Sequence, residues 1–93
     1  MKRVYTDDAI EDLRRLREFI EVHNSSAAAR VASELVAKIG DLLDFPEQGA
    51  FVERAPTPGS VRDMVFGKYV VRYSVHPTVI IVLRVWHGLE GER

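Results

Sequence analysis

Residues 61–87 read VRDMVFGKYVVRYSVHPTVIIVLRVWH and contain three runs rich in Val, Ile, Tyr and Phe. Gly67 and Lys68 separate the first run from the second, and the triplet at residues 76–78 separates the second from the third. Short β-branched and aromatic runs divided by turn residues predict a three-stranded antiparallel meander. The third run, residues 79–85, is apolar on both faces apart from Arg84, which is typical of a strand in the middle of a sheet.

The chain has 93 residues, which predicts a single domain spanning residues 1–93. Apolar residues make up 46% and charged residues 29% of it, the usual balance of a globular domain. It has no cysteine, and its three histidines lack the spacing of a zinc site, so we expect neither a metal nor a cofactor. No signal peptide or membrane-spanning run is visible, so the sequence predicts a cytoplasmic protein with no membrane partner.

Residues 2–5 form a short possible strand ahead of the first helical pattern. Thr6 has the character of an N-cap, and the first helix is predicted over residues 7–22. Arginines and acidic residues alternate along it, which favours a solvated face with ion pairs over a nucleic-acid face. Its predicted apolar stripe consists of Ile10, Leu13, Leu16 or Arg17, and Ile20.

A second helix is predicted over residues 27–45, capped by Ser25 or Ser26 and ended by Pro46. The short turn between the helices predicts an antiparallel hairpin, with Gly40 as a packing contact. Residues 50–54 are a possible edge strand, and residues 55–60 a loop. The apolar stripe of this helix consists of Ala28, Val31 or Ala32, Leu35, Ile39 and Leu42.

The order of elements predicts an α+β fold, in which an N-terminal strand and an antiparallel two-helix hairpin pack on one face of a small, mostly antiparallel sheet. An aspartate at position 35 or 39 should therefore unfold the domain.

Strand alternation predicts which face of the sheet is free. Strict alternation places Tyr69, Val71, Tyr73 and Val75, together with Ile81, Leu83 and Val85, beneath the helices. The opposite face would carry Val70, Arg72, Ser74 and His76, and Ile80, Val82, Arg84 and Trp86. An apolar face bearing arginines and a tryptophan is typical of a protein-binding surface or a cleft.

Charge is distributed unevenly along the chain. Residues 6–48 hold ten acidic and five basic residues, a net charge of −5, whereas residues 61–88 carry a net charge of +3. The cationic sheet favours an anionic partner, either nucleic acid or an acidic protein segment. The overall charge of −1 argues against broad nonspecific binding of nucleic acid.

Four segments together resemble the RelE/ParE superfamily of bacterial type II toxin–antitoxin systems over nearly the whole chain. They are AIEDLRRLREFIE, AAARVASELVAKIGDLLDFPEQG, VRDMVFGKYVVRYSV and VIIVLRVWHG. The resemblance implies two helices packed on a small sheet, and a cognate antitoxin that wraps and neutralises the toxin in a hetero-oligomer. An acidic amphipathic antitoxin segment would suit the apolar and basic face, either as a helix in a groove or as an added strand.

The superfamily includes two activities: RelE-like members cut mRNA on the ribosome, and ParE-like members inhibit DNA gyrase without being hydrolases. RNA cleavage without a metal needs a general base, a general acid and cations that stabilise the phosphorane. The candidate nuclease residues are Arg62, Arg72, Arg84 and His87. Val70 stands where the family often has Arg, and residues 49–60 contain one basic residue, Arg54. These departures favour the gyrase inhibitor.

The sequence thus predicts a toxin that inhibits DNA gyrase by binding it and that a cognate antitoxin neutralises. One alternative is an endoribonuclease that acts with the ribosome on mRNA, and another is a non-toxic member that only binds antitoxin. The predicted partner-binding residues are Arg62, Arg72, Arg84, Trp86 and His87. From the sequence, Arg84→Ala is expected to weaken partner binding and to leave folding nearly intact.

Overall fold

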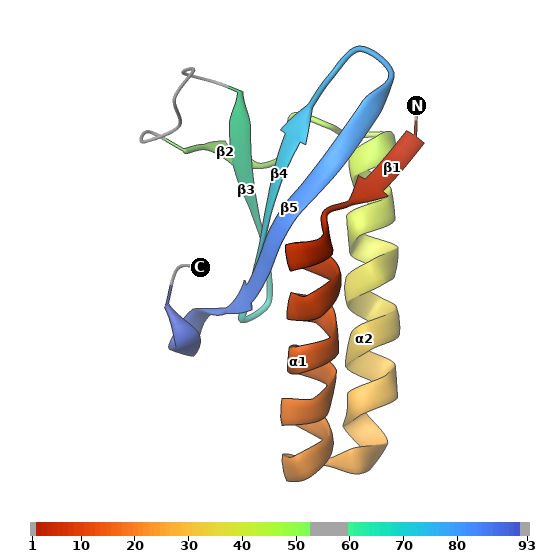
Figure 1. Ribbon diagram of the computed structural model, residues 1–93, viewed down its shortest axis with the longest axis vertical. Helices are drawn as coiled ribbons and strands as arrows, with labels where there is room; N and C mark the ends of the chain where they lie inside the picture. The colour runs from red at the N-terminus through yellow and green to blue at the C-terminus, as the bar shows by residue number, and fades with distance from the viewer. Residues whose placement is uncertain (1, 53–59, 92–93) are drawn as a thin grey trace.

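The computed structural model describes residues 2–52 and 60–91 and places a two-helix hairpin against one mixed sheet (Figure 1). Among the described residues, no helix is long and apolar enough to cross a membrane. The predicted loop at residues 55–60 lies outside the described residues except for Ser60. The elements in chain order are β1 (Lys2–Tyr5), α1 (Asp7–His23), α2 (Ser25–Gly40), a 3₁₀ turn η1 (Asp41–Leu43), β2 (Ala50–Phe51), β3 (Val61–Phe66), β4 (Tyr69–Val75), β5 (Val79–His87) and a second 3₁₀ turn η2 (Gly88–Glu90).

The sheet has the strand order β1-β5-β4-β3-β2. The pairs from β2 to β5 are antiparallel, and β1 runs parallel to β5. The predicted meander and the interior position of the last strand are therefore confirmed. Of the edge strand predicted at residues 50–54, β2 covers Ala50–Phe51, and residues 53 and 54 lie outside the described residues.

Both helices begin at polar caps. The Thr6 hydroxyl accepts a hydrogen bond from the Ala9 N–H at 3.0 Å, as the sequence predicts. The second helix is capped by Asn24, whose side chain accepts from the Ala27 N–H at 3.2 Å, and not by a serine. That helix ends at Gly40 and continues as the 3₁₀ turn η1, so it is shorter than the predicted range 27–45. A Cβ on Gly40 would lie 2.9 Å from a guanidinium nitrogen of Arg3, which supports its role as a packing contact.

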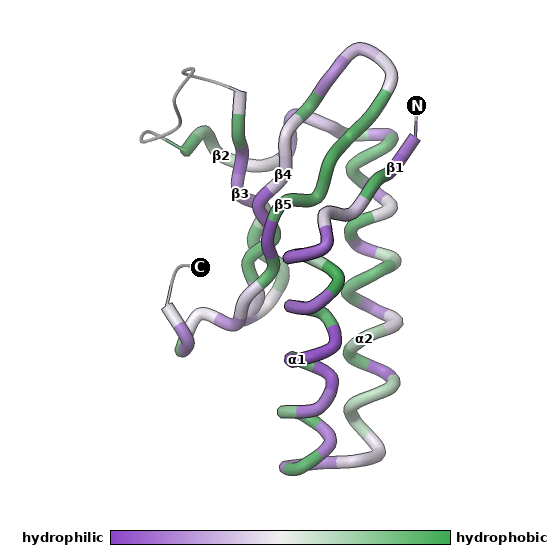
Figure 2. Tube along the Cα trace, viewed as in Figure 1, coloured by the Kyte–Doolittle hydropathy of each residue, from purple (hydrophilic) through white to green (hydrophobic). Residues whose placement is uncertain are grey.

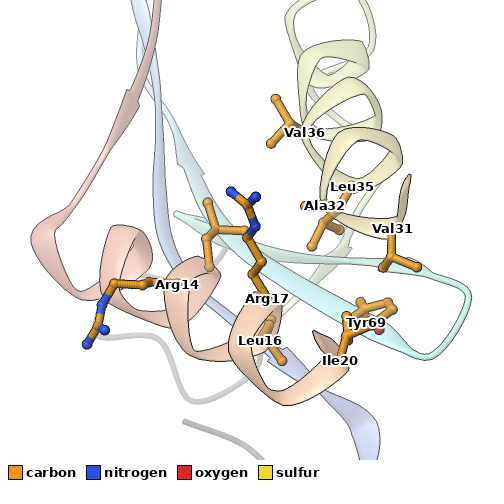
Figure 3. A pocket seen from close by; sticks show the side chains of 10 residues that line it. Arg14, Leu16, Arg17, Ile20, Val31, Ala32, Leu35, Val36 and Tyr69 are labelled. Atoms are coloured by element: carbon orange, nitrogen blue, oxygen red, sulfur yellow. The ribbon is translucent and has the colours of Figure 1, made fainter. Parts of the chain in front are cut away.

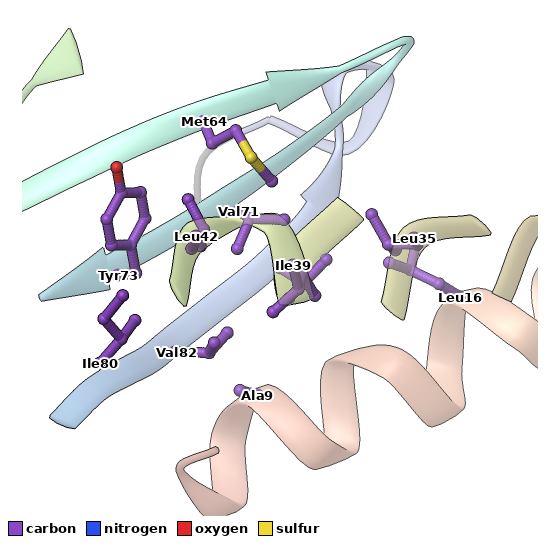
Figure 4. Packing of buried hydrophobic residues seen from close by; sticks show 11 residues of the cluster. Ala9, Leu16, Leu35, Ile39, Leu42, Met64, Val71, Tyr73, Ile80 and Val82 are labelled. Carbon is purple, nitrogen blue, oxygen red and sulfur yellow. The ribbon is translucent and has the colours of Figure 1, made fainter. Parts of the chain in front are cut away.

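The core lies between the hairpin and one face of the sheet (Figure 4). Hydropathy along the chain follows this arrangement, since α1 is largely hydrophilic and the middle of β5 is continuously hydrophobic (Figure 2). In α1 the buried residues are Ala9, Asp12 and Leu16, while Ile10 is 56% exposed, so the predicted stripe is wrong at Ile10. The buried cluster consists of Ala9, Leu16, Leu35, Ile39, Leu42, Met64, Val71, Tyr73, Ile80, Val82 and Val85.

A register shift in β5 overturns part of the predicted face assignment. Arg72 pairs with Arg84 and Tyr73 pairs with Val82, so Leu83 is an extra residue opposite β4. A β-bulge of this kind reverses the alternation of side chains beyond it. Ile80 and Val82 consequently face the helices and are fully buried, although strict alternation placed them on the free face. Residues after the bulge follow the prediction, because Val85 faces the core, and Arg84 and Trp86 take the other face.

The segment Pro46-Glu47-Gln48-Gly49 is held against the sheet by the side chain of Tyr73. The Tyr73 hydroxyl donates to the Pro46 carbonyl at 2.8 Å and accepts from the Gly49 N–H at 2.9 Å. A Cβ on Gly49 would lie 2.7 Å from that hydroxyl and 2.9 Å from the Asp63 carbonyl oxygen. This close approach explains why a glycine closes the segment.

We expect Gly49→Ala to lower the free energy of unfolding by about 2–4 kcal/mol, because the methyl group must displace the buried Tyr73 side chain and weaken its hydrogen bonds. Denaturant unfolding would measure the loss. Gly88→Ala is the matched control, since its Cβ would lie 3.4 Å from the nearest heavy atom, and we expect a change under 1 kcal/mol. Equal stability of the two variants would contradict this account of Gly49.

Candidate functional site

The five predicted site residues do not form one cluster. Arg72, Arg84 and Trp86 share the sheet face opposite the core, as predicted, and His87 follows them at the end of β5. Arg62 pairs with the buried Tyr73 across the strands, so it belongs to the face on which the helices pack. A site built from all three arginines is therefore not assembled in this structure.

The Arg62 guanidinium binds backbone carbonyl groups of the segment between η1 and β2. Its Nη1 donates to the Gly49 carbonyl at 2.8 Å and to the Glu47 carbonyl at 3.1 Å. Its Cζ lies 4.1 Å from the centre of the Phe51 ring, within the range of a cation–π contact. Arg62 thus ties residues 47–51 to β3.

Arg72 stacks against Trp86 on the outer face, which is the face of the sheet opposite the core. The Arg72 guanidinium donates two hydrogen bonds to the Asp63 carboxylate, at 2.8 and 2.9 Å. Its Cζ lies 5.0 Å from the centre of the Trp86 ring. Trp86 is only 5% exposed, so the outer face does not offer the open tryptophan surface that the sequence suggested.

Arg84 is engaged by a buried carboxylate that the sequence did not single out. Asp12 of α1 is 1% exposed and accepts from Arg84 at 2.8 and 3.0 Å. It also accepts from the Val85 N–H at 2.9 Å and from Arg15 at 2.6 Å. Burial raises the pKa of the Asp12 carboxyl, but these hydrogen bonds outweigh burial and lower the pKa to about 2. The alternating charges of α1 were predicted to be solvated, and Asp12 is the exception.

Arg15 extends this network to the end of the described chain. Its guanidinium contacts the Glu90 carboxylate at 3.0 and 3.3 Å. Glu90 in turn accepts from the His87 N–H at 2.9 Å, which completes a capping box at the turn η2. The first helix, β5 and η2 are therefore joined through polar groups as well as through the core.

His87 has a defined structural contact. Its Nδ1 accepts from the Leu89 N–H at 3.0 Å, which places the proton of the neutral ring on Nε2. The ring also meets Tyr69 edge to face, with 5.2 Å between centroids. His87 thus caps the turn that follows β5.

The sequence did not predict the groove between the two helices, because the apolar stripes of both helices were assigned to the core. It has a volume of about 290 Å³ and is surrounded by side chains of α1, α2 and the start of β4 (Figure 3). Its charged lining residues are Arg14 and Arg17, with no carboxylate among the lining residues. Arg14 pairs with Glu11 and Glu18, whereas Arg17 forms no ion pair with any described residue.

A second apolar depression, of about 380 Å³, lies where η2 meets the turn between β3 and β4. Val65 and Leu89, its most exposed apolar residues, are 67% and 91% exposed. Val65 lies in β3 and Leu89 in the turn η2, and no sequence pattern indicates that they line one depression, so only the structure reveals it. It is lined by Val65, Gly67, Lys68, Val70, His87, Gly88 and Leu89.

Comparisons with known proteins agree with this architecture. The family model described as the ParE toxin of the type II toxin–antitoxin system parDE matches residues 4–91. The chain belongs to the ParE toxin family. It is 34% identical to Toxin RelE1 of Caulobacter vibrioides over 84 residues, which covers 88% of this chain and 87% of that protein. Toxin RelE2 of the same bacterium is 31% identical over 85 residues, covering 91% of this chain and 92% of that protein.

A solved structure shares the fold of this ParE family member. It is described as a chromosomal ParDE TA system from P. aeruginosa, with a TM-score of 0.79 and 21% identity, and the match covers 94% of this chain and 95% of that one. The predicted α+β fold and the predicted superfamily are thus confirmed. The chain is a type II toxin of the ParE/RelE family, and membership implies a cognate antitoxin as its partner.

Proposed function

We propose that this toxin inhibits DNA gyrase by binding it and that it does not cleave RNA. The observation that carries the proposal is that Arg62, Arg72 and Arg84 are all engaged within the molecule. Arg72 and Arg84 each form a two-point contact with a carboxylate, and Arg62 bonds two carbonyl groups.

Metal-independent cleavage of RNA requires arginine or lysine side chains that are free to contact the phosphate. The phosphorane formed by 2′-hydroxyl attack must be stabilised by cations that face the scissile phosphate. Guanidinium groups neutralised by Asp12 and Asp63 would have to give up those carboxylates first, and the loss of a buried partner is costly. A surface that acts by binding another protein has no such requirement.

The acid–base groups are sparse. Cleavage of this kind needs both a general base and a general acid. In His87 the Nδ1 atom accepts a hydrogen bond from the Leu89 N–H, so only its Nε2 atom can exchange a proton, and Glu90 is bound to Arg15. The match of the ParE family model to residues 4–91 supports gyrase as the target, because ParE-like toxins act on gyrase. A cytoplasmic location and neutralisation in a toxin–antitoxin hetero-oligomer belong to the same proposal.

We expect the purified toxin to block supercoiling by the DNA gyrase of the bacterium that encodes it, at concentrations that leave mRNA intact in a translating extract. Both assays should be run on one preparation, with the unfolded variant Ile39→Asp as the inactive control. Full supercoiling at a large molar excess of toxin would contradict the proposal, and cleavage within codons would identify the ribosome as the target. Normal growth on expression without antitoxin would indicate a member that has lost toxicity.

A further inference from the structure

The turn η2 is held more firmly than its length suggests. The Gly88 N–H donates to the Lys68 carbonyl at 2.7 Å, which fixes the turn to the connection between β3 and β4. The capping box between His87 and Glu90 closes it internally. The ion pair of Glu90 with Arg15 fixes it to α1. The turn is therefore fixed at three places in the unbound toxin.

This firmly held turn exposes a large apolar side chain. Leu89 is 91% exposed, more than any other large hydrophobic residue of the described chain. It stands at the rim of the depression of about 380 Å³, and Val65 lines the same depression. Leucine on a pre-ordered turn loses little conformational freedom when it enters a partner, which is the property of an efficient interface anchor.

The charges around the depression define the chemistry of the partner. Its lining contains Lys68 and His87 and no carboxylate. The Lys68 ammonium forms no ion pair with any described residue. The complementary surface is therefore an apolar pocket with an acidic residue positioned to meet Lys68.

We propose that Leu89, supported by Val65 and Lys68, is the anchor through which the toxin binds gyrase, at an apolar pocket bordered by an acidic residue. This inference rests on the proposed function. Leu89 is 91% exposed on a turn that is fixed at three places, which suits insertion of its side chain into a pocket of a globular target. The groove between α1 and α2 is a separate surface made by other residues, so variants of the depression leave that groove unchanged.

The test compares Leu89→Ala with wild-type toxin and with Val22→Ala, which truncates another highly exposed apolar side chain, 83% exposed, on α1 and outside the depression. We expect Leu89→Ala to raise the toxin concentration for half-inhibition of supercoiling at least tenfold, and Val22→Ala to leave it unchanged. Lys68→Glu should weaken inhibition by several fold, and by less at high salt. All three variants should melt within about 2 °C of wild type, because the replaced side chains are exposed.

Titration with the cognate antitoxin provides the second readout. Retained antitoxin binding together with lost gyrase inhibition supports the proposal. Unchanged inhibition by Leu89→Ala overturns it, and so does selective loss of antitoxin binding, which would assign the depression to the antitoxin. Failure of the wild-type toxin to inhibit gyrase rejects the proposed function itself, and that result is distinct because it appears before any variant is compared.

Discussion

Replacing Asp12 by alanine is expected to lower the free energy of unfolding by about 3–5 kcal/mol, the usual cost of breaking a buried ion pair by removing one partner. The carboxylate is 1% exposed and accepts hydrogen bonds from Arg84, Arg15 and the Val85 N–H. Its loss leaves Arg84 and the Val85 N–H without their acceptor inside the protein, whereas Arg15 keeps Glu90. For a domain of this size the melting temperature should fall by at least about 12 °C, as calorimetry would measure.

Two comparisons make this test of Asp12 specific. Glu21→Ala removes an exposed acid from the same helix and should change stability by less than 1 kcal/mol. Asp12→Asn keeps the volume of the side chain and removes the charge, so it should approach the alanine variant in stability. A melting temperature of Asp12→Ala within about 2 °C of wild type would show that the network is not stabilising.

Low pH should lower the free energy of unfolding of the wild-type protein through protonation of the same carboxyl group. The pKa of Asp12 is lowered from 3.8 to about 2 in the folded state, so its contribution is fully present above pH 4. That contribution, about 2 kcal/mol, is lost as the pH falls from 4 to 2, because the unfolded state then binds the proton more readily. In Asp12→Asn this part of the pH dependence should be missing.

Local sequence patterns were sufficient for most of the elements. The Thr6 cap, the apolar stripe of α2 and the turn residues between β3, β4 and β5 all depend on neighbours within a few positions. Such features follow from spacing and turn chemistry alone. The order of strands and helices then left few ways to cover one face of the sheet, which is why the α+β fold could be predicted.

Features that depend on distant contacts could not be predicted. Strand alternation cannot reveal the bulge at Leu83, which the pairing of β5 with β4 defines, and the bulge reverses the faces of Ile80 and Val82. The charges of Asp12 and Arg84 lie 72 positions apart in sequence, and Asp12 resembled an ordinary residue of a solvated helix face. Their pairing changes our expectation for Arg84→Ala, which should now cost stability because it leaves Asp12 short of a donor.

The sequence predicted which residues of the candidate site are unusual, but not how they contact one another. The sequence identified the arginines and Trp86 as unusual in an apolar sheet, and Arg72, Arg84 and Trp86 do share one face. It could not show that Asp63 and Asp12 neutralise two of these arginines, since ion pairs between elements have no fixed spacing. The role of these residues in binding partners stays a prediction, and Arg72 deserves the first test because Trp86 lies directly beside it.

Ile39→Asp is expected to unfold the domain. Ile39 is fully buried in the cluster between α2 and the sheet, and that cluster contains no cation that could pair with a carboxylate. The variant loses about 2–5 kcal/mol of apolar packing and in addition must bury a charge or a protonated acid, which together match the whole stability of a small domain. Circular dichroism and calorimetry should show no cooperative transition at 25 °C or above. Val36→Asp is the matched control on the same helix, 39% exposed, and it should stay folded. A cooperative melt of Ile39→Asp close to that of Val36→Asp would contradict the burial of α2 against the sheet.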